Sequence, residues 1–394
     1  MNGTNKWINI HILQKNKREN RPMRKLSRYL LIITLFTLIS IQYGYAQVSI
    51  TSVPFLQIEP DSRAAGMGNA NVAIADNASA IYWNPAGFAF QKGNQISITH
   101  SNWLPQFNTD LFYDYLVGKY YVNGIGTIGA DVTFLNLGQQ AYTDEKGNNL
   151  GTFRSYEFAV GAAYGFKLSP HFSLGTGARF IYSNLVPSGI TVGGQQARLG
   201  TSVSFDIAGL YKTSPFKVAN RKASFNAGFD LSNLGPGIQY SDNAQKDPLP
   251  TILRVGWSYT MNLDKDGYNT ITIANDFSKL IARNDTSGNS MSVTSALFNS
   301  WGSYTRFNGS KYVTLSPLDQ IMIGTGIEYW YDKKFALRTG YFYENPKNGD
   351  RRYITFGAGL RYNIFGVDFS YIYTLQNNNP LANTIRFSVL LNFK

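Results

Sequence analysis

Apolar and small or polar residues alternate along most of the chain from Asn94 to the C-terminus. Between 155 and 166 the even positions, from Tyr156 to Phe166, are mostly aromatic or aliphatic, and the odd positions are Ser, Glu, Ala and Gly. The same alternation recurs at 172–183, 365–374 and 385–394. Because successive side chains of a strand point to opposite faces, each run predicts a strand with one apolar face.

The alternating runs are mostly about ten residues or longer, the length that a tilted strand needs to cross a bilayer. Strands of soluble proteins centre near five or six residues. The predicted strands are 94–103, 108–121, 125–137, 153–167, 171–185, 201–213, 223–234, 249–261, 268–281, 317–331, 334–344, 351–363, 365–375 and 381–393. We therefore predict an all-β fold, a transmembrane antiparallel β-barrel of about fourteen strands; a soluble β-protein is the alternative.

The predicted connections alternate between tight and long. Tight connections fall at Val122–Gly124, Leu168–Pro170, Asp332–Lys333 and Asn363–Phe365, and long ones lie at 138–152, 186–200, 235–248 and 282–316. Short periplasmic turns and long outer loops are typical of outer-membrane barrels. Both chain ends are then expected on the periplasmic side.

A segment of small residues, Asp61–Phe90, precedes the first predicted strand. Ala, Gly and Asn recur throughout it, so it can pack closely against a wall but cannot build a thick core of its own. Asp61 is expected to cap a short helical turn that Gly66 and Gly68 end. The Asn84-Pro85-Ala86 sequence is a turn or breaker signal. We interpret residues 47–92 as an N-terminal hatch, or plug, that fills the barrel of residues 93–394.

The first 46 residues have the parts of a cleavable secretory signal. Arg24, Lys25 and Arg28 precede the apolar run 29–41, and Gly44-Tyr45-Ala46 supplies small residues for cleavage before Gln47. The apolar run is shorter than the roughly 17–25 residues of a spanning helix, although an uncleaved anchor is the alternative. Met23 is a second candidate start, which would make residues 1–22 an upstream extension.

Charge and composition narrow the function classes. The net charge is +12, but residues 1–46 hold eight of the 36 Lys and Arg and one of the 24 Asp and Glu. The remainder therefore carries 28 bases against 23 acids, which removes the main support for a nucleic-acid partner. The chain has no cysteine and 15% aromatic residues, which excludes a disulfide scaffold and disfavours disorder.

The longest predicted loop, 282–316, contains apolar residues spaced like one face of a short helix. They are Met291, Val293, Leu297, Phe298 and Trp301. An apolar face on an outer loop suggests a partner, and a fold back over the mouth of the barrel is the other interpretation. We take these five residues as the candidate partner-binding site.

The motifs that could carry chemistry are weak. Gly124, Gly126 and Gly129 match G-x-G-x-x-G, but a strand pattern follows where a dinucleotide site needs a helix, so no cofactor is expected. His171 and Ser173 could share a strand face as base and nucleophile, as in some outer-membrane lipid hydrolases, but no orienting acid is evident. His100 is expected near Trp103 at the outer rim. We predict no catalytic residue, no metal site and no enzymatic activity.

An aromatic cluster in the second predicted strand has two interpretations. Its members are Phe112, Tyr113, Tyr115, Tyr120 and Tyr121. They could form a surface on which a ligand stacks. Aromatic girdles at the two membrane interfaces explain them more simply.

Several stretches of the sequence together carry a family resemblance. They are the stretch from Asp61 to Ala70, Ala80-Ile-Tyr-Trp-Asn-Pro-Ala-Gly, Trp103-Leu-Pro, Asn136-Leu-Gly, Tyr156-Glu-Phe-Ala and Arg179-Phe-Ile-Tyr-Ser-Asn-Leu. These stretches resemble PorV/PorQ-type proteins, relatives of the FadL fatty-acid channels, which share an Asn-Pro-Ala hatch. The hatch residues that match are Gly66, Met67, Gly68, Asn84, Pro85 and Ala86. A departure is Lys394, which follows Phe393 where many barrels end on the aromatic residue.

This resemblance implies an outer-membrane barrel of a Bacteroidetes-type bacterium that serves the type IX secretion system. Such a protein receives cargo with a C-terminal signal domain from the translocon barrel and passes it to the sortase complex for attachment to the surface. Its expected partners are these proteins and outer-membrane lipid. The alternative function is a FadL-like transporter of small hydrophobic molecules, which would need an apolar cavity beside the hatch.

Overall fold

The computed structural model describes residues 51–107, 110–144, 146–192, 194–241, 246–284, 289–307 and 311–393, all within the compact unit Tyr45–Lys394. The predicted leader 1–46 and the first hatch residues 47–50 lie outside this described part. The predicted domain boundaries therefore stay predictions.

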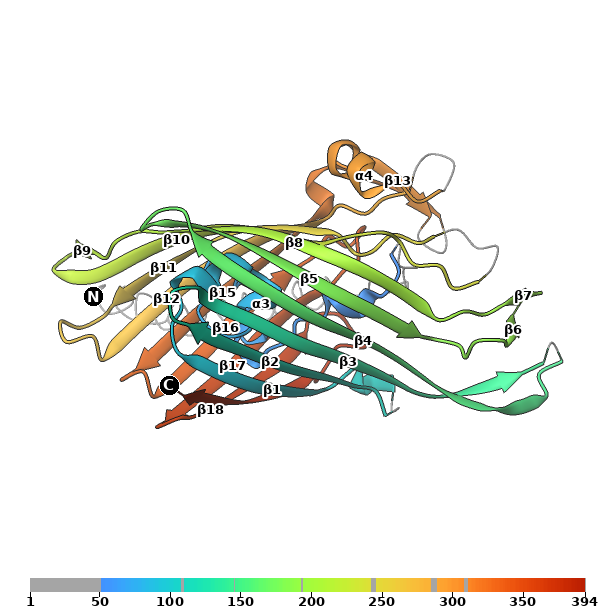
Figure 1. Cartoon of the computed structure of the whole chain (residues 1–394), viewed down its shortest axis with the longest axis horizontal. Coiled ribbons are helices and arrows are strands. Elements are labelled where there is room, and N and C mark those ends of the chain that lie inside the picture. The colour runs from blue at the N-terminus through green and yellow to red at the C-terminus, as the bar shows by residue number, and fades with distance from the viewer. Residues whose placement is uncertain are drawn as a thin grey trace, which may run out of the picture. The chain divides into compact units, whose positions relative to one another are not determined.

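Fourteen strands form a closed antiparallel barrel in which each strand pairs with its neighbours along the chain (Figure 1). Pairing of the first strand with the last, from Asn94 with Phe393 to Ser101 with Arg386, closes the ring. The strands are β1 Asn94–Asn102, β2 Phe112–Val122, β3 Gly126–Thr143, β4 Asn149–Lys167, β5 Phe172–Asn184, β8 Gly200–Lys212, β10 Arg221–Leu234, β11 Ile252–Asn262, β12 Asn269–Leu280, β15 Ile321–Tyr331, β16 Phe335–Tyr343, β17 Arg352–Tyr362, β18 Phe365–Thr374 and β19 Ile385–Phe393. The predicted barrel of about fourteen strands is confirmed.

The two faces of each strand have opposite chemistry. In β1, Gln95, Ser97 and Thr99 are buried toward the lumen, whereas Ile96 and Ile98 are exposed on the outside. An apolar surface outside a polar interior is the arrangement of a barrel that lies in lipid. Rings of Phe112, Phe134, Tyr156 and Tyr182 follow one another across β2 to β5 with centroids 6.0, 6.0 and 6.1 Å apart.

This row is an aromatic girdle near the long-loop end, and the exposed Tyr120 lies at the other end of β2. Two residues of the predicted girdle are placed differently. Tyr113 and Tyr115 are 1% and 0% exposed and point into the lumen. The interpretation of these two as girdle residues was wrong because the strand alternation turns the odd positions of β2 inward.

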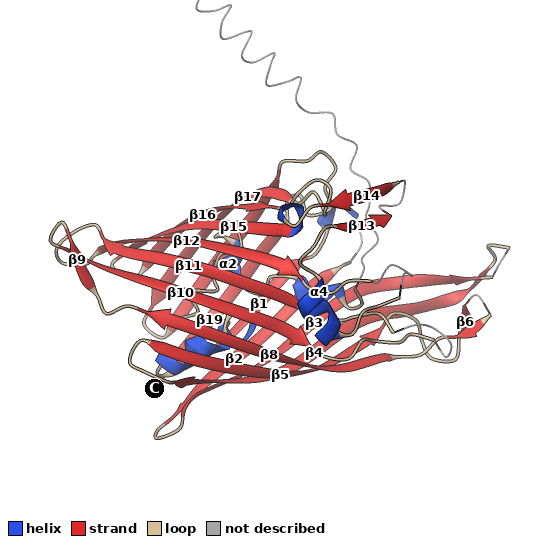
Figure 2. Cartoon of the chain, turned by 90° about the horizontal axis from the view of Figure 1, so that it is seen from above, coloured by secondary structure: helices blue, strands red, loops and turns tan. Residues whose placement is uncertain are grey.

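The connections separate into a short-turn end and a long-loop end (Figure 2). The short-turn end holds the β2–β3, β4–β5, β15–β16 and β17–β18 turns, the β9 strand (Phe216–Val218), and the start of β1 and end of β19. The long-loop end carries η3 (Pro105–Phe107), the β6–β7 hairpin (Thr191–Val192, Gln195–Gln196), α4 (Val293–Asn299), the β13–β14 hairpin (Tyr304–Phe307, Tyr312–Leu315) and η4 (Leu318–Gln320).

One predicted loop is mostly strand. β3 continues to Thr143 and β4 begins at Asn149, so most of the segment predicted as the loop 138–152 belongs to these two strands. They form a hairpin that is longer than the neighbouring strands β2 and β5. The prediction was wrong because the polar and glycine residues of this segment resemble a loop, although antiparallel pairing of β3 with β4 keeps them extended. Register shifts at Asn136/Gln139 and Tyr142/Thr143 interrupt the ladder there.

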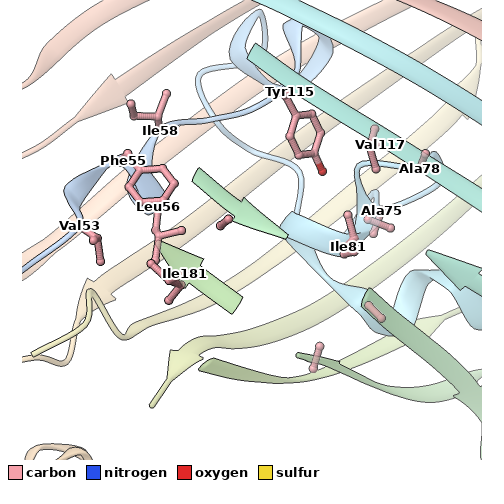
Figure 3. Close-up of a cluster of buried hydrophobic side chains, with 14 of the residues drawn as sticks. Val53, Phe55, Leu56, Ile58, Ala75, Ala78, Ile81, Tyr115, Val117 and Ile181 are labelled. Carbon is pink, nitrogen blue, oxygen red and sulfur yellow. The ribbon is translucent and has the colours of Figure 1, made fainter. Parts of the chain in front are cut away.

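The hatch lies inside the barrel as four short helices joined by turns. They are η1 Pro54–Gln57, α2 Ser62–Ala65, α3 Ala80–Trp83 and η2 Pro85–Phe90. Figure 3 shows Phe55, Leu56 and Ile81 of the hatch near Tyr115, Val117 and Ile181 of the barrel wall. None of the described helices is long and apolar enough to span a bilayer.

Candidate functional site

The first hatch motif, Gly66-Met67-Gly68, packs directly on the backbone of the barrel wall. Asp61 caps α2 as predicted, because its Oδ1 accepts a hydrogen bond of 2.9 Å from the Ala64 nitrogen. Gly68 has a φ of +61°, and a Cβ there would lie 2.6 Å from the Tyr341 nitrogen. Only glycine allows both the left-handed conformation and this close approach.

The barrel wall also has glycines at this contact. Gly324 and Gly326 of β15 and Gly340 of β16 face Met67 and Gly68 at distances too short for any Cβ, and Gly357 of β17 faces Gly66. The Gly68 nitrogen also donates to Thr355 Oγ1 at 2.9 Å. The first motif therefore docks backbone against backbone.

The second hatch motif, Asn84-Pro85-Ala86, docks on the opposite wall. Asn84 Nδ2 donates to the Val72 oxygen at 2.9 Å and to the Gly209 oxygen of β8 at 3.1 Å, and its Oδ1 accepts from the Ala86 nitrogen at 3.1 Å. A Cβ on Gly165 of β4 would lie 2.5 Å from the Pro85 oxygen. Asn84 thus ends α3, caps η2 and ties the hatch to the barrel at once.

A carboxylate of the wall also holds the hatch. Asp276 Oδ2 of β12 accepts hydrogen bonds from two successive hatch nitrogens, those of Asn71 at 2.7 Å and Val72 at 2.8 Å. Charge-assisted bonds of this kind are among the stronger ones in proteins. Asp276 was not identified from the sequence; the available signal was an acid in the middle of an alternating strand.

A chain of ion pairs connects the hatch to β15, β16 and β18. Arg63 of α2 contacts Asp76 at 2.5 Å and Glu328 at 2.7 Å, and Arg338 then bridges Glu328 at 2.6 Å and Asp368 at 2.8 Å. Removing one partner of such a buried network leaves an uncompensated charge, which is strongly destabilising. These residues, like Asp276, were missed.

The hatch also contacts the seam where the first and last strands meet. Ser388 Oγ of β19 shares hydrogen bonds with Ser62 Oγ of the hatch at 2.8 Å and with Thr99 Oγ1 of β1 at 2.7 Å. One hydroxyl therefore links the hatch to both strands of the seam.

Burial changes the acidity of two hatch side chains. It raises the pKa of Asp61 above its usual 3.8, although Trp83 Nε1 donates to Asp61 Oδ2 at 3.0 Å. Burial raises the pKa of Tyr82 to about 12, opposed by the adjacent Arg254 guanidinium. Tyr82 is therefore neutral at physiological pH.

A small cavity of about 40 Å³ remains between the hatch and β11, β12, β15 and β16. That volume accommodates a few water molecules. Charged and amide side chains line much of it, including Glu59, Asn69, Arg254, Asp276 and Arg351. The cavity therefore has the wrong size and polarity for a drug-sized apolar ligand.

The candidate partner-binding residues lie on α4 and beside it, and they separate into two groups. Met291 and Val293 line a narrow cavity with Ile281 and Ala296, on the side of α4 that folds back on the barrel. Phe298 is 82% exposed and Trp301 is 49% exposed. Leu297 is half-buried, and its carbonyl accepts a bond of 2.7 Å from Trp301 Nε1. The five residues are therefore divided between a side that faces the barrel and a side that faces outward, and their role in binding a partner stays a prediction.

The base of this loop is firmly anchored. Arg283 donates to the Asn299 and Gly302 oxygens, each at 3.0 Å, and Gln320 Oε1 accepts from Lys279 at 2.5 Å. Three further large apolar side chains of the same loop are exposed, namely Phe307, Tyr312 and Leu318. We call Phe298, Trp301, Phe307, Tyr312 and Leu318 the exposed loop residues.

The weak chemical motifs occupy structural positions. Gly124 and Gly126 form the β2–β3 turn with φ of +81° and +122°, and Gly129 faces the Phe88 ring of the hatch. Ser173 Oγ is buried and donates to the Ala86 oxygen at 2.8 Å, whereas His171 Nδ1 faces the Lys212 oxygen at 2.9 Å.

His100 Nδ1 lies 2.7 Å from Asp114 Oδ1 on the exposed surface. Within the described ranges, no cluster of three or more His, Cys, Asp or Glu could hold a metal ion.

Comparison with known proteins gives one family. The model of the family described as "Type IX secretion system protein PorV" matches residues 43–286. No curated protein matches the chain. Similar solved structures include the toluene transporter TodX of Pseudomonas putida (TM-score 0.49, 11% identity, 86% of this chain and 99% of that chain). Two others are the Ralstonia pickettii toluene transporter TbuX (0.45, 11%, 86% and 99%) and a Pseudomonas aeruginosa FadL homologue (0.41, 12%, 89% and 99%).

Proposed function

This chain belongs to the PorV family of type IX secretion system proteins, and on that premise we propose that it is a carrier rather than a channel or an enzyme. It is an outer-membrane component of the secretion system. In our proposal it binds cargo through the C-terminal signal domain, receives it from the translocon barrel and delivers it to the sortase complex.

The observation that carries this proposal is the combination of a hatch bonded to opposite walls of the barrel with exposed apolar side chains on an anchored outer loop. The exposed loop residues include Phe298, which is 82% exposed, on a loop whose base Arg283 and Gln320 fix. Large aromatic side chains on a rigid base bind partners with little loss of conformational entropy. Such a surface suits a protein partner.

The alternative, a FadL-like transporter of small hydrophobic molecules, receives less support. A transporter of this kind needs an apolar cavity beside the hatch. The cavity at that place is small, and Arg254, Asp276 and Arg351 contribute to its lining. The hatch is also bonded to the wall on opposite sides, through Asn84 and Gly68.

Deletion of the gene tests the carrier function directly. We expect proteins with C-terminal signal domains to disappear from the cell surface and accumulate in the periplasm, as measured by quantitative proteomics of both fractions. Complementation with the intact gene is the control. Normal surface delivery in the deletion strain would refute the proposal.

A narrower prediction concerns the loop. Phe298→Asp combined with Trp301→Asp should reduce co-purification with the translocon at least about tenfold, because exposed aromatic anchors often contribute about 2 kcal/mol or more to an interface. The barrel should remain heat-modifiable on gels. Phe107→Asp combined with Leu150→Asp, at two other exposed outer-loop positions (both 54%), is the matched control. If both variants co-purify with the translocon equally, the exposed loop residues are not part of the interface.

A further inference from the structure

The short-turn end of the barrel carries a set of lysines that the carrier function does not explain. We call Lys92, Lys119, Lys167, Lys212, Lys217 and Lys222 the basic collar. Lys92 is the last residue of the hatch, and the others lie at or near the ends of β2, β4, β8, β9 and β10. These residues are far along the chain from α4 and belong to the opposite end of the barrel.

The lysines of the collar lie on the lumen side of the barrel wall and not on its lipid surface. Lys119 is buried and its Nζ donates to the Lys92 oxygen at 3.1 Å, so the accessible part of the collar is Lys92, Lys167, Lys217, Lys222 and the half-buried Lys212. Lys119, Lys167 and Lys212 each neighbour an exposed aromatic residue, respectively Tyr120, Phe166 and Tyr211. Adjacent residues of a strand point to opposite faces, so the rings face lipid and the lysines face the lumen. Ammonium positions confirm this direction, because Lys167 Nζ and Lys212 Nζ both lie 5.2 Å from the centroid of the Phe90 ring of the hatch.

The β9–β10 hairpin extends the same charge outward. Lys222 lies on the face of β10 that also carries Asn226, whose side chain donates to the Ala73 oxygen of the hatch. Lys217 is the direct cross-strand partner of Lys222. Like charges directly opposite each other destabilise a hairpin unless an anion lies between them.

The described residues provide little counter-charge for the collar, since the acid that attracts Lys119 and Lys212, Asp76 of the hatch, is shared with Arg63. Among the described residues, no carboxylate oxygen lies within 4.0 Å of the Nζ atom of any of these six lysines, so none of them forms an ion pair. Asp76, on the hatch, is already 2.5 Å from Arg63. In the neighbouring turns, Asp332 contacts Lys334 at 2.5 Å, and Asp264 accepts bonds from the Tyr268 and Asn269 nitrogens of its own turn.

We propose that the basic collar is a docking surface for an acidic segment, rich in Asp and Glu, of a periplasmic partner protein. The positive charges spread over five strands and the base of the hatch, so an extended acidic segment fits them better than a single small anion. Their direction toward the lumen argues against phospholipid headgroups as the occupant. Complementary charge of this kind raises association rates and selects partners.

Binding of a synthetic acidic peptide to the purified full chain in zwitterionic detergent tests this proposal. The probe is a fluorescent peptide of alternating Glu and Ser, with a Gln and Ser peptide as its neutral counterpart, followed by fluorescence anisotropy. We expect the acidic peptide alone to bind, with affinity that falls as salt rises from about 50 to about 300 mM because salt screens exposed charges. The variant Lys167→Glu, Lys217→Glu, Lys222→Glu should bind at least about tenfold more weakly.

Two further variants keep the test decisive. Replacing the same three lysines with Gln removes charge without adding acid and should give an intermediate affinity. Lys146→Glu, Arg154→Glu, Lys246→Glu makes the same charge change at the long-loop end and should bind like the wild type. Equal binding by the wild type and the collar variant, or an equal loss in the outer variant, would overturn the proposal.

The lipid alternative has its own outcome. The wild type could co-purify with anionic phospholipid while the collar variant does not, with neither protein binding the peptide. That result would show that the lysines bind lipid headgroups, and it would refute the docking surface. The experiment involves neither the outer loop nor cargo, so its failure leaves the carrier function untouched.

Discussion

Asp61 combines two roles in a single side chain, because it caps α2 and accepts a hydrogen bond from the Trp83 indole. Both bonds are made by a carboxylate that is 5% exposed. Burial nevertheless dominates and raises the pKa of Asp61. Burial therefore favours the protonated acid, whereas the hydrogen bonds from Ala64 and Trp83 favour the carboxylate and only partly offset it.

The sign of the resulting pH dependence follows from linkage. An acid whose pKa is raised on folding contributes stability that is complete below the unfolded pKa, near 3.8, and is lost as pH rises through the folded pKa. Asp61→Asn keeps an oxygen for the Ala64 nitrogen but does not titrate. We expect its unfolding temperature, relative to wild type, to increase between about pH 4 and about pH 7.5.

The variant also loses the hydrogen bond from Trp83, and this loss lowers its unfolding temperature by an amount that does not depend on pH. The difference between the two proteins at each pH, measured by thermal unfolding in detergent, therefore isolates the titration of Asp61. A difference that stays constant across the range would contradict the assignment.

At the scale of elements, the strand and hatch predictions succeeded because they rest on local rules. Two-residue alternation located all fourteen barrel strands to within about four residues at most ends, and small residues identified the hatch. The long β3–β4 hairpin was missed, because its polar sequence gave no local sign of pairing. The ion-pair chain from Arg63 to Asp368 was also missed, because alternation turns charges inward without specifying which of them meet.

The glycines of β15 to β17 give a testable prediction about the position of the hatch. A Cβ at Gly340 would overlap the hatch backbone at Met67 and Gly68, so Gly340→Val leaves no room for the hatch in its present position. We expect the hatch to be displaced or loosened, at a cost above the roughly 1–3 kcal/mol of ordinary overpacking. Limited proteolysis of the folded barrel should then cleave within 51–92. Gly118→Val, where a Cβ meets nothing closer than 3.7 Å, should leave the hatch protected.

At the scale of the whole molecule, the hatch is bonded to the wall on several sides, through Gly68, Asn84, Asp276 and Arg63. A carrier that works through its outer surface has no need to move this hatch. A transporter that passes a ligand through the lumen must move the hatch to open a path. The two functions therefore differ in what happens when the hatch is locked.

A disulfide between hatch and barrel makes this difference measurable. The chain has no cysteine, and Ser62 Oγ and Ser388 Oγ are 2.8 Å apart, so Ser62→Cys with Ser388→Cys introduces a single possible bond. We expect equal surface delivery of cargo under oxidising and reducing conditions. The single variant Ser62→Cys controls for the loss of the hydroxyl. A block that appears only on oxidation and is reversed by reductant would show that the hatch must move.

The hydroxyl that joins Ser62, Thr99 and Ser388 also bears on how the ring is closed. The first and last strands are joined by their own backbone pairing and by the Thr99–Ser388 hydrogen bond, and Ser62 of the N-terminal segment adds a bond to the same hydroxyl. The segment inside the barrel therefore contributes to the joint that closes the ring. Its removal would leave the Ser388 hydroxyl with one hydrogen-bond partner fewer at the place where the two ends of the sheet meet.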